Sequence, residues 1–152
     1  MASTILLATA GDCDAVIGCV HRAYAGYVEL IGRRPAPMDA DYADLIARDV
    51  VYVLRESGAE RVYGVIVMRP EQGALFVENV AVDPRHQHQG FGRQLMAFAE
   101  DQARRLGLPE VRLYTHERMT ENITLYRRLG YQEVDRRMDD GFSRVFMRKL
   151  LS

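Results

Sequence analysis

Residues 75–106 read LFVENVAVDPRHQHQGFGRQLMAFAEDQARRL, and the order of structural signals along them sets the prediction for the whole chain. The first eight residues are rich in β-branched and aromatic side chains, which favour a buried strand. Pro84 ends this strand because proline has no N–H to donate to a sheet. From Phe91 to Leu106 apolar residues recur at helical spacing, and Gly107 follows as a typical left-handed cap. The stretch therefore predicts a strand, a glycine-bearing loop and an amphipathic helix.

The predicted loop is suited to binding phosphate. The first N–H groups of a helix have no intrahelical partner, and the helix dipole adds partial positive charge there. Gly90 and Gly92 remove the side chains that would block a close approach to the backbone. Dinucleotide loops have the pattern G-x-G-x-x-G and P-loops end in Lys-Ser/Thr, and neither pattern is present. The alternative interpretation is an ordinary turn that uses glycine for its geometry.

Two motifs resemble those of one enzyme family. The pattern Gln-x-x-Gly-x-Gly at 87–92, after a strand that ends Val-Ala-Val-Asp-Pro, resembles the acyl-CoA pyrophosphate loop of the GNAT superfamily of acetyl-CoA-dependent N-acetyltransferases. The segment 122–131, with Asn122, Leu125, Tyr126, Leu129, Gly130 and Tyr131, resembles a second motif of that family. The resemblance covers essentially the whole chain, and it implies acetyl-CoA as co-substrate.

The resemblance also implies which residues hold the co-substrate. Backbone groups of Val80, Ala81 and Val82 would contact the pantetheine arm, and Asn122 would make a polar contact to the pantetheine or phosphate side. The residues that would surround the pyrophosphate are Gln87, His88, Gln89, Gly90, Phe91, Gly92 and Arg93.

The remaining sequence predicts an α/β fold with the element order β-α-α-β-β-β-α-β-α-β-β. Strands are expected at 4–8, 50–54, 62–68, 75–82, 110–115, 131–138 and 142–150, and helices at 13–29, from 39 or 41 to 47, at 93–106 and at 120–129. Asp12 is expected to cap the first helix, residues 32–37 to form an exposed loop, and Ser57-Gly58-Ala59 to form a hairpin turn. This is the order of the GNAT fold, which implies a mixed, mostly antiparallel sheet of about seven strands flanked by about four helices.

Length and composition place limits on the class of protein. The 152 residues are expected to form a single domain, 1–152. The net charge is −1 and no run of five Lys or Arg occurs, so nucleic acid is not an expected partner. The sequence shows neither a signal peptide at its start nor an apolar run of membrane-spanning length, which predicts a cytoplasmic protein without a membrane partner. Cys13 and Cys19 lie ~9 Å apart along one predicted helix and cannot form a bridge within it. The four histidines form no metal-ligand set, so no metal is expected.

Amide formation from acetyl-CoA and an amine requires three kinds of group. Deprotonating a lysine-type ammonium at pH 7 costs ~4.6 kcal/mol, so a base is useful. An O–H group that protonates the departing thiolate improves the leaving group, and backbone N–H groups can polarise the carbonyl. The resemblance of 122–131 to the family motif implies that Tyr126 is this proton donor, and a packing tyrosine is the alternative.

The base has two candidates. Glu78 lies on the central strand, where family members often have a carboxylate, and strand alternation predicts that Asn79 faces the opposite side. His116, just after the fifth strand, is the rival because its unperturbed pKa is about 6.5. Glu78 could instead be a strand residue that faces solvent or forms an ion pair, and His116 could instead cap the next helix.

The acceptor is expected to be a small-molecule amine. In the family, the loop between the first two helices and the last hairpin form the walls of the acceptor site, and here that loop brings Arg33 and Arg34 near Tyr24 and Tyr27. Two arginines could hold the carboxylate of an amino-acid-like amine, whereas the neighbouring acidic residues would favour a cationic amine. A peptide N-acetyltransferase and a non-catalytic acyl-CoA binder are the alternatives. Homodimers are common in the family, and no residue here specifies a contact face.

Overall fold

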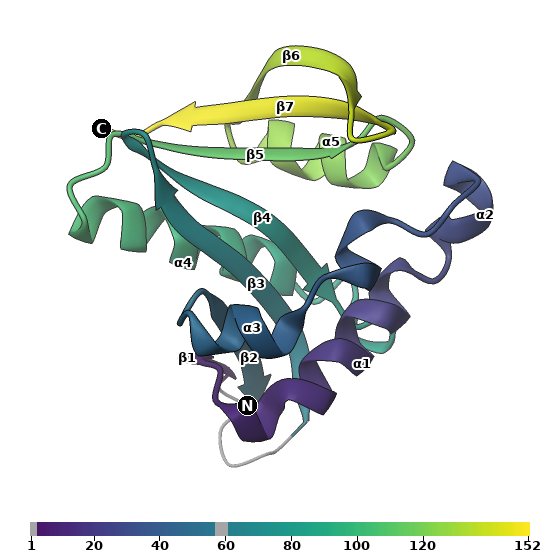
Figure 1. Ribbon diagram of the computed structural model, residues 1–152. Helices are drawn as coiled ribbons and strands as arrows, with labels where there is room; N and C mark the ends of the chain where they lie inside the picture. Colours follow the sequence, from purple (N-terminus) through teal and green to yellow (C-terminus); the bar gives the residue numbers. More distant parts are fainter. Residues whose placement is uncertain (1–2, 57–60) are drawn as a thin grey trace.

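The computed structural model of the chain describes residues 3–56 and 61–152 (Figure 1). Within these ranges the sheet has seven strands in the order β1-β2-β3-β4-β5-β7-β6, and the β4–β5 contact is the parallel one. The strands are β1 Ser3–Leu7, β2 Val51–Glu56, β3 Val62–Glu71, β4 Ala74–Val82, β5 Glu110–His116, β6 Gln132–Asp139 and β7 Phe142–Leu150. The α-helices are α1 Cys13–Tyr24, α2 Tyr27–Ile31, α3 Tyr42–Ala47, α4 Phe91–Arg105 and α5 Thr120–Arg128. Three short 3-10 helices are η1 Ala10–Asp12, η2 Ala36–Asp39 and η3 Pro84–His86.

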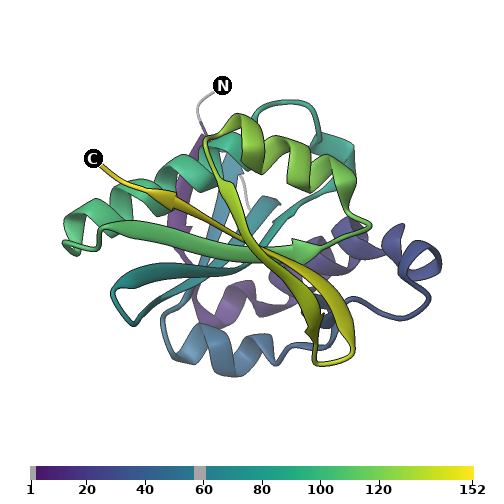
Figure 2. The same cartoon turned by 90° about the horizontal axis from the view of Figure 1, so that it is seen from above.

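Helices cover both faces of the sheet (Figure 2). One apolar core lies between the sheet and helices α4 and α5, and its buried members include Leu95, Met96 and Ile123. A second core lies between the sheet and helices α1 and α3, and it includes Val16 and Val20. The predicted fold class and strand number are confirmed, and the element order is as predicted apart from one additional helix before β2. Among the described residues, no helix is both long and apolar enough to cross a bilayer.

Three local expectations are wrong. The helix expected at 13–29 is two helices, because the chain leaves the helix at Ala25–Gly26 between α1 and α2. Asp12 makes no side-chain cap to α1; its carboxylate accepts from the Thr9 N–H at 2.8 Å instead. The loop 32–37 is only partly exposed, since Pro35 is buried and η2 begins at Ala36. The expected turn at 57–59 lies outside the described residues.

Candidate active site

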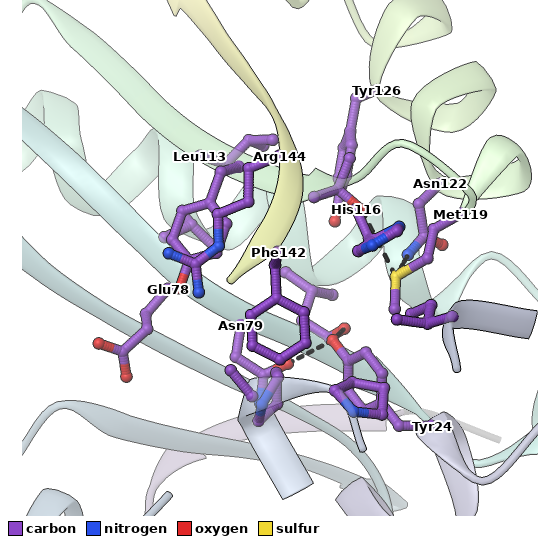
Figure 3. Close-up of a pocket in the computed structure, with 18 residues that line it drawn as sticks. Tyr24, Glu78, Asn79, Leu113, His116, Met119, Asn122, Tyr126, Phe142 and Arg144 are labelled. Atoms are coloured by element: carbon purple, nitrogen blue, oxygen red, sulfur yellow. Dashed lines mark hydrogen bonds between the residues drawn. The ribbon is translucent and has the colours of Figure 1, made fainter. Parts of the chain in front are cut away.

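Strands β4 and β5 diverge in the middle of the sheet. They pair only from Leu75 opposite Val111 to Val77 opposite Leu113, although β4 continues to Val82 and β5 to His116 (Figure 1). A pocket lies where the pairing stops, and it is lined from both faces of the sheet (Figure 3). Tyr126 of α5 lies on one side and Tyr24 of α1 on the other.

A β-bulge in β4 controls which side chains enter this pocket. Val67 of β3 pairs with Asn79 and the next residue pairs with Val77, so Glu78 has no partner. Val77 belongs to the core under α4 and α5, whereas Ala81 belongs to the core under α1 and α3. The bulge therefore interrupts the alternation, and Glu78 and Asn79 both line the pocket. The expectation that they face opposite sides is wrong for this reason.

The backbone of β4 has free groups along the opening. The Asp83 N–H donates to the Tyr63 carbonyl oxygen at 2.9 Å, which makes these two residues a hydrogen-bonded pair. Such pairs alternate along an antiparallel ladder, so Ala81 also bonds to β3 while Val80 and Val82 direct their backbone groups toward the opening. The Val80 N–H can thus donate to a carbonyl oxygen bound in the pocket.

Tyr126 directs its hydroxyl into the pocket (Figure 3). Its side chain is held by the core, and its ring lies edge-on to Tyr131 at 6.0 Å between centroids. Among the described residues, none forms a hydrogen bond with the Tyr126 hydroxyl. Burial raises the pKa of Tyr126, so the hydroxyl keeps its proton at neutral pH. It is a positioned donor without a partner.

Tyr24 and Asn79 form a fixed polar wall on the other side. The Tyr24 hydroxyl lies 2.5 Å from Asn79 Oδ1 and 3.1 Å from the Val80 carbonyl oxygen, either of which can accept its proton. Asn79 Nδ2 donates to the Tyr42 hydroxyl at 3.1 Å, and that hydroxyl donates to the Pro37 carbonyl oxygen at 2.6 Å. This buried chain of hydrogen bonds joins α1, β4 and α3.

Of the described residues that line the pocket, Glu78 is the one with a carboxylate side chain. It accepts from Arg69 Nη1 at 2.6 Å, and its side chain is 27% exposed. In Figure 3 its carboxylate points away from Tyr126 and the centre of the pocket. Contact with a substrate amine would therefore need a relay through solvent.

His116 lines the pocket beyond the end of the β4–β5 pairing. Its Nδ1 accepts from the Arg118 backbone N–H at 3.1 Å, so the neutral ring carries its proton on Nε2. Partial burial lowers the pKa of His116, which favours this neutral form. The ring therefore presents a donor, not a base, through Nε2.

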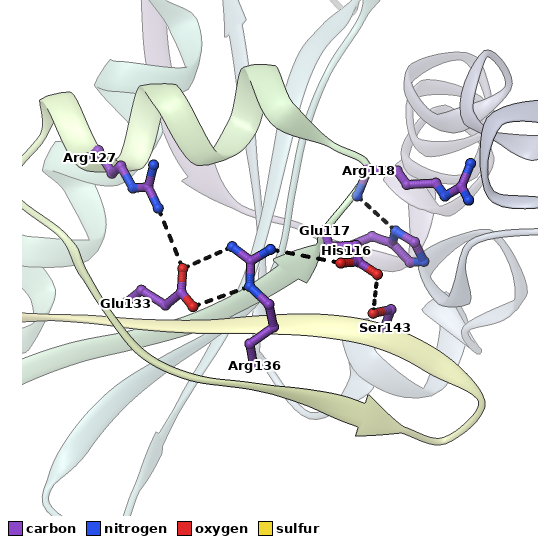
Figure 4. A network of polar contacts seen from close by, with 7 residues as sticks. All are labelled: His116, Glu117, Arg118, Arg127, Glu133, Arg136 and Ser143. Carbon is purple, nitrogen blue, oxygen red and sulfur yellow. Dashed lines mark hydrogen bonds and ion pairs between the residues drawn. The ribbon is translucent and has the colours of Figure 1, made fainter.

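A network of charged side chains holds this end of β5 (Figure 4). Arg136 of β6 donates to Glu133 at 2.9 Å and lies 3.7 Å from Glu117, which also accepts from Ser143 of β7. Arg127 of α5 reaches Glu133 at 3.4 Å. The network links α5 and the last hairpin to the loop that follows His116.

The other predicted acceptor residues lie at the rim or outside the pocket. Arg33 donates to the Gly141 carbonyl oxygen at 3.3 Å, and its guanidinium lies 4.1 Å from the centre of the Phe142 ring. Arg34 is paired with Asp39 at 2.9 Å. Neither arginine lines the pocket, and Tyr27 stands beside Tyr24 at 6.4 Å between ring centroids.

Several lining residues were missed by the sequence analysis. They are Tyr114 and Thr115 of β5, Met119, Phe142 and Arg144 of β7, and Pro35, Ala36 and Pro37 of the loop. Alternation along β7 places Phe142, Arg144 and Phe146 on one face. An arginine between two aromatic residues on one strand face was the signal in the sequence that could have indicated these pocket residues. Asn122 was predicted, and it lies beside the pocket with Nδ2 3.6 Å from Met119 Sδ.

The loop before α4 is open to an anion. Gly90 is the N-cap with φ of 81°, a conformation that glycine adopts without strain, and no acidic residue lies in the first turn. Among the described residues, none accepts from the N–H groups of Phe91, Gly92 or Arg93. A Cβ at Gly92 would lie 3.3 Å from Leu125 of α5, so glycine also permits the close approach of the two helices. This helix start has the character of a phosphate site.

The buried thiol has no part in the site. Cys19 is fully buried in the core under α1, and burial raises its pKa to about 12. Neither Cys19 nor Cys13 lines the pocket. No group of three or more His, Cys, Asp or Glu side chains in the described ranges gathers as a metal site would.

Divergent central strands, a helix start without acidic residues and a tyrosine aimed into the opening are the features expected of an acyl-CoA-dependent transferase. A family model for the acetyltransferase (GNAT) domain matches residues 47–133, which is more than half of the chain. The chain belongs to the GNAT family. The predicted family, its fold and an acetyl-CoA-dependent acyltransferase activity are confirmed.

Solved structures of this fold include several acetyltransferases. A PaiA N-acetyltransferase from Thermoplasma acidophilum, in complex with coenzyme A, is 16% identical with a TM-score of 0.83, covering 99% of this chain and 100% of that one. The ribosomal-protein-S18-alanine N-acetyltransferase of Escherichia coli is 23% identical with a TM-score of 0.78, covering 99% and 95%. The putative acetyltransferase yncA of Salmonella typhimurium, solved with acetyl-CoA, is 26% identical with a TM-score of 0.74, covering 100% and 95%.

Proposed function

We propose that this protein transfers the acetyl group of acetyl-CoA to a primary amine of a small molecule, by direct attack in a ternary complex. The observation that carries the proposal is the pocket that passes between β4 and β5, with Tyr126 on one face and Tyr24 on the other. Acetyl-CoA would enter from the side of α4 and α5. The acceptor would enter from the side of α1 and the last hairpin.

The co-substrate would be held by backbone more than by side chains. The pyrophosphate would lie on the loop Gln87–Arg93, where the first N–H groups of α4 are free. The pantetheine arm would follow Val80, Ala81 and Val82, because the backbone groups of Val80 and Val82 face the opening. It would also pass Asn122.

The transfer step assigns roles to three groups of the protein, and two further residues would contact the acceptor. The neutral amine nitrogen attacks the thioester carbon, the carbon–sulfur bond breaks, and the Tyr126 hydroxyl protonates the departing thiolate. The proton that the nitrogen loses as the amide forms restores the Tyr126 hydroxyl through solvent. The Val80 N–H donates to the carbonyl oxygen as negative charge develops on it. Glu78, rather than His116, receives the proton of the ammonium, because the Nδ1 of His116 already accepts a hydrogen bond. The proton reaches Glu78 through solvent, because the Glu78 carboxylate faces Arg69. Tyr24 and His116 would contact the acceptor.

A small acceptor is favoured by the contact between the two walls of the entrance. Arg33, after α2, reaches across to Gly141 in the turn between β6 and β7, and Arg118 donates to the Leu30 carbonyl oxygen at 3.1 Å. These contacts hold the α2 segment against the last hairpin and against the loop after β5, where an extended peptide would need space. A peptide N-acetyltransferase is the second candidate, since a ribosomal-protein N-acetyltransferase has this fold.

Release of free thiol from acetyl-CoA over a panel of amines tests the proposal. The panel contains amino acids, polyamines, aminoglycosides and short peptides with free N-termini. Turnover on free amines and not on peptides supports the small-molecule assignment. Turnover confined to peptides would support the second candidate, and binding of acetyl-CoA without any turnover would indicate a non-catalytic binder.

A further inference from the structure

Arg144 is a buried cation in the acceptor half of the pocket. Its side chain is 9% exposed, and its guanidinium carbon lies 4.2 Å from the centre of the Tyr114 ring. Arg144 is directly opposite His116 in the β5–β7 register, so the two side chains share one face of the sheet. Arg144 therefore lies beside a residue that the acceptor would contact.

Most of the donors of Arg144 are unused. A guanidinium has five N–H groups, and here one at Nη1 donates to Asp139 Oδ2 at 2.8 Å. In the described part of the chain, no residue accepts from Nε or Nη2. These donors remain available to a bound molecule, and a ligand that supplies oxygen atoms at this position would form charge-assisted hydrogen bonds with them.

The acidic side chains around the pocket use only a small part of the hydrogen-bonding capacity of Arg144. Glu78 is engaged by Arg69 at 2.6 Å, and Asp139 is 45% exposed and binds a single nitrogen of Arg144. The planar fork of a guanidinium matches the two oxygens of a carboxylate and gives two parallel hydrogen bonds. Tyr114, stacked under the guanidinium, keeps the plane of the fork fixed.

We propose that Arg144 recognises a carboxylate on the acceptor, so that the substrate is an amine that also carries an acidic group, as amino acids do. This inference rests on the proposed function and narrows its substrate class. It gives to Arg144 the role that the sequence suggested for Arg33 and Arg34, which are committed to Gly141 and Asp39.

The test uses acceptors in pairs that differ only by the carboxylate, such as phenylalanine with phenethylamine and glycine with methylamine. The quantity measured is the ratio of kcat/KM for the acid to that for the plain amine. We expect wild type to favour the acid, and Arg144→Gln to lower the ratio about 10- to 100-fold. Arg144→Lys, which keeps the charge and loses the fork, should fall between them. Arg148→Gln removes a charge from an exposed position of the same strand and should leave the ratio unchanged.

A binding measurement separates this inference from the proposed function. In the presence of CoA, the acid member of each pair should raise the unfolding midpoint of wild type more than the plain amine does. A wild-type ratio of one or below, or an equal loss on both members in Arg144→Lys and Arg144→Gln, would overturn the inference and leave acetyl transfer intact. Absence of turnover on every amine, with no midpoint shift by acetyl-CoA, would overturn the proposed function itself.

Discussion

Glu78 and Asn79 are consecutive residues of β4, yet both line the same pocket, because the bulge leaves Glu78 without a partner on β3. Asn79 is 5% exposed and holds Tyr24 in place, whereas Glu78 faces Arg69 at the open edge. Bulges often redirect side chains next to active sites. Here the bulge places the buried, hydrogen-bonded Asn79 directly after the partly exposed Glu78, for which we propose the proton-accepting role.

Replacing Tyr126 with Phe should lower kcat by about 100-fold, because the departing thiolate loses its proton donor. The KM for acetyl-CoA should change little, since the ring remains. Tyr131→Phe is the matched control, because the Tyr131 hydroxyl bonds to Glu100 at 3.0 Å outside the pocket. Steady-state thiol release measures both variants. Turnover of Tyr126→Phe equal to wild type would remove the general-acid role.

Glu78→Gln should lower kcat/KM by about 10- to 100-fold near neutral pH, and the loss should shrink as rising pH deprotonates the free amine. His116→Gln should cost much less, because the neutral ring already carries its proton on Nε2. The pH dependence of kcat/KM distinguishes the two variants. A larger loss in His116→Gln, with the low-pH limb of the profile abolished, would assign the base to His116 instead.

Asp83 should stabilise the fold in a pH-dependent way. It is fully buried, and hydrogen bonds from Arg85, with further help from Arg22, hold its pKa well below the usual range. A lowered pKa in the folded state stabilises the protein above the unfolded value of about 3.9, and this contribution is lost as pH falls. Asp83→Asn should therefore lower the free energy of unfolding by about 1–3 kcal/mol at pH 7, and by less below pH 4. Urea unfolding at several pH values measures this difference, and an unchanging difference from pH 7 to pH 3 would contradict it.

Gly141→Ala should open the entrance of the pocket. Gly141 has φ of 80°, and an added Cβ would lie 2.6 Å from Arg33 Nη1, so the Arg33 guanidinium must move, and we expect its bridge to the Gly141 carbonyl oxygen to weaken. Gly73→Ala is the matched control, because Gly73 has the same φ and no atom within 4 Å of the added Cβ. We expect peptide acetylation to rise relative to small-amine acetylation in Gly141→Ala and in Arg33→Ala, but not in Gly73→Ala. An unchanged ratio would show that the bridge does not select against peptides.

Much of the fold follows from local signals in the sequence. The alternation in β5 and β7, the helical spacing in α4 and the glycine at position 107 each depend on residues close together in the chain, and the structure has these elements within a few residues of their predicted bounds. The break between α1 and α2 was missed because Ala25 and Gly26 carry no strong stop signal beside continuing apolar spacing.

The site depends on longer-range features. The bulge at Glu78 arises from the β3–β4 register, which no pattern within β4 specifies. Arg33 contacts Gly141 across 108 positions, and the pairing of β4 with β5, which stops at Val77, involves two strands that are separated by α4 in the chain. The motif residues Tyr126 and Asn122 could be predicted because their spacing is local, whereas the pocket position of Arg144 could not.

Binding of acetyl-CoA to the loop before α4 is the central claim, and isothermal titration with acetyl-CoA, CoA and NAD tests it most directly. We expect acetyl-CoA and CoA to bind and NAD not to bind. Gln89→Glu places a negative charge on the loop and should weaken binding, whereas Gln132→Glu, the same change on exposed β6, should not. Binding of NAD, or acetyl-CoA affinity that is equal in wild type and Gln89→Glu, would contradict the claim.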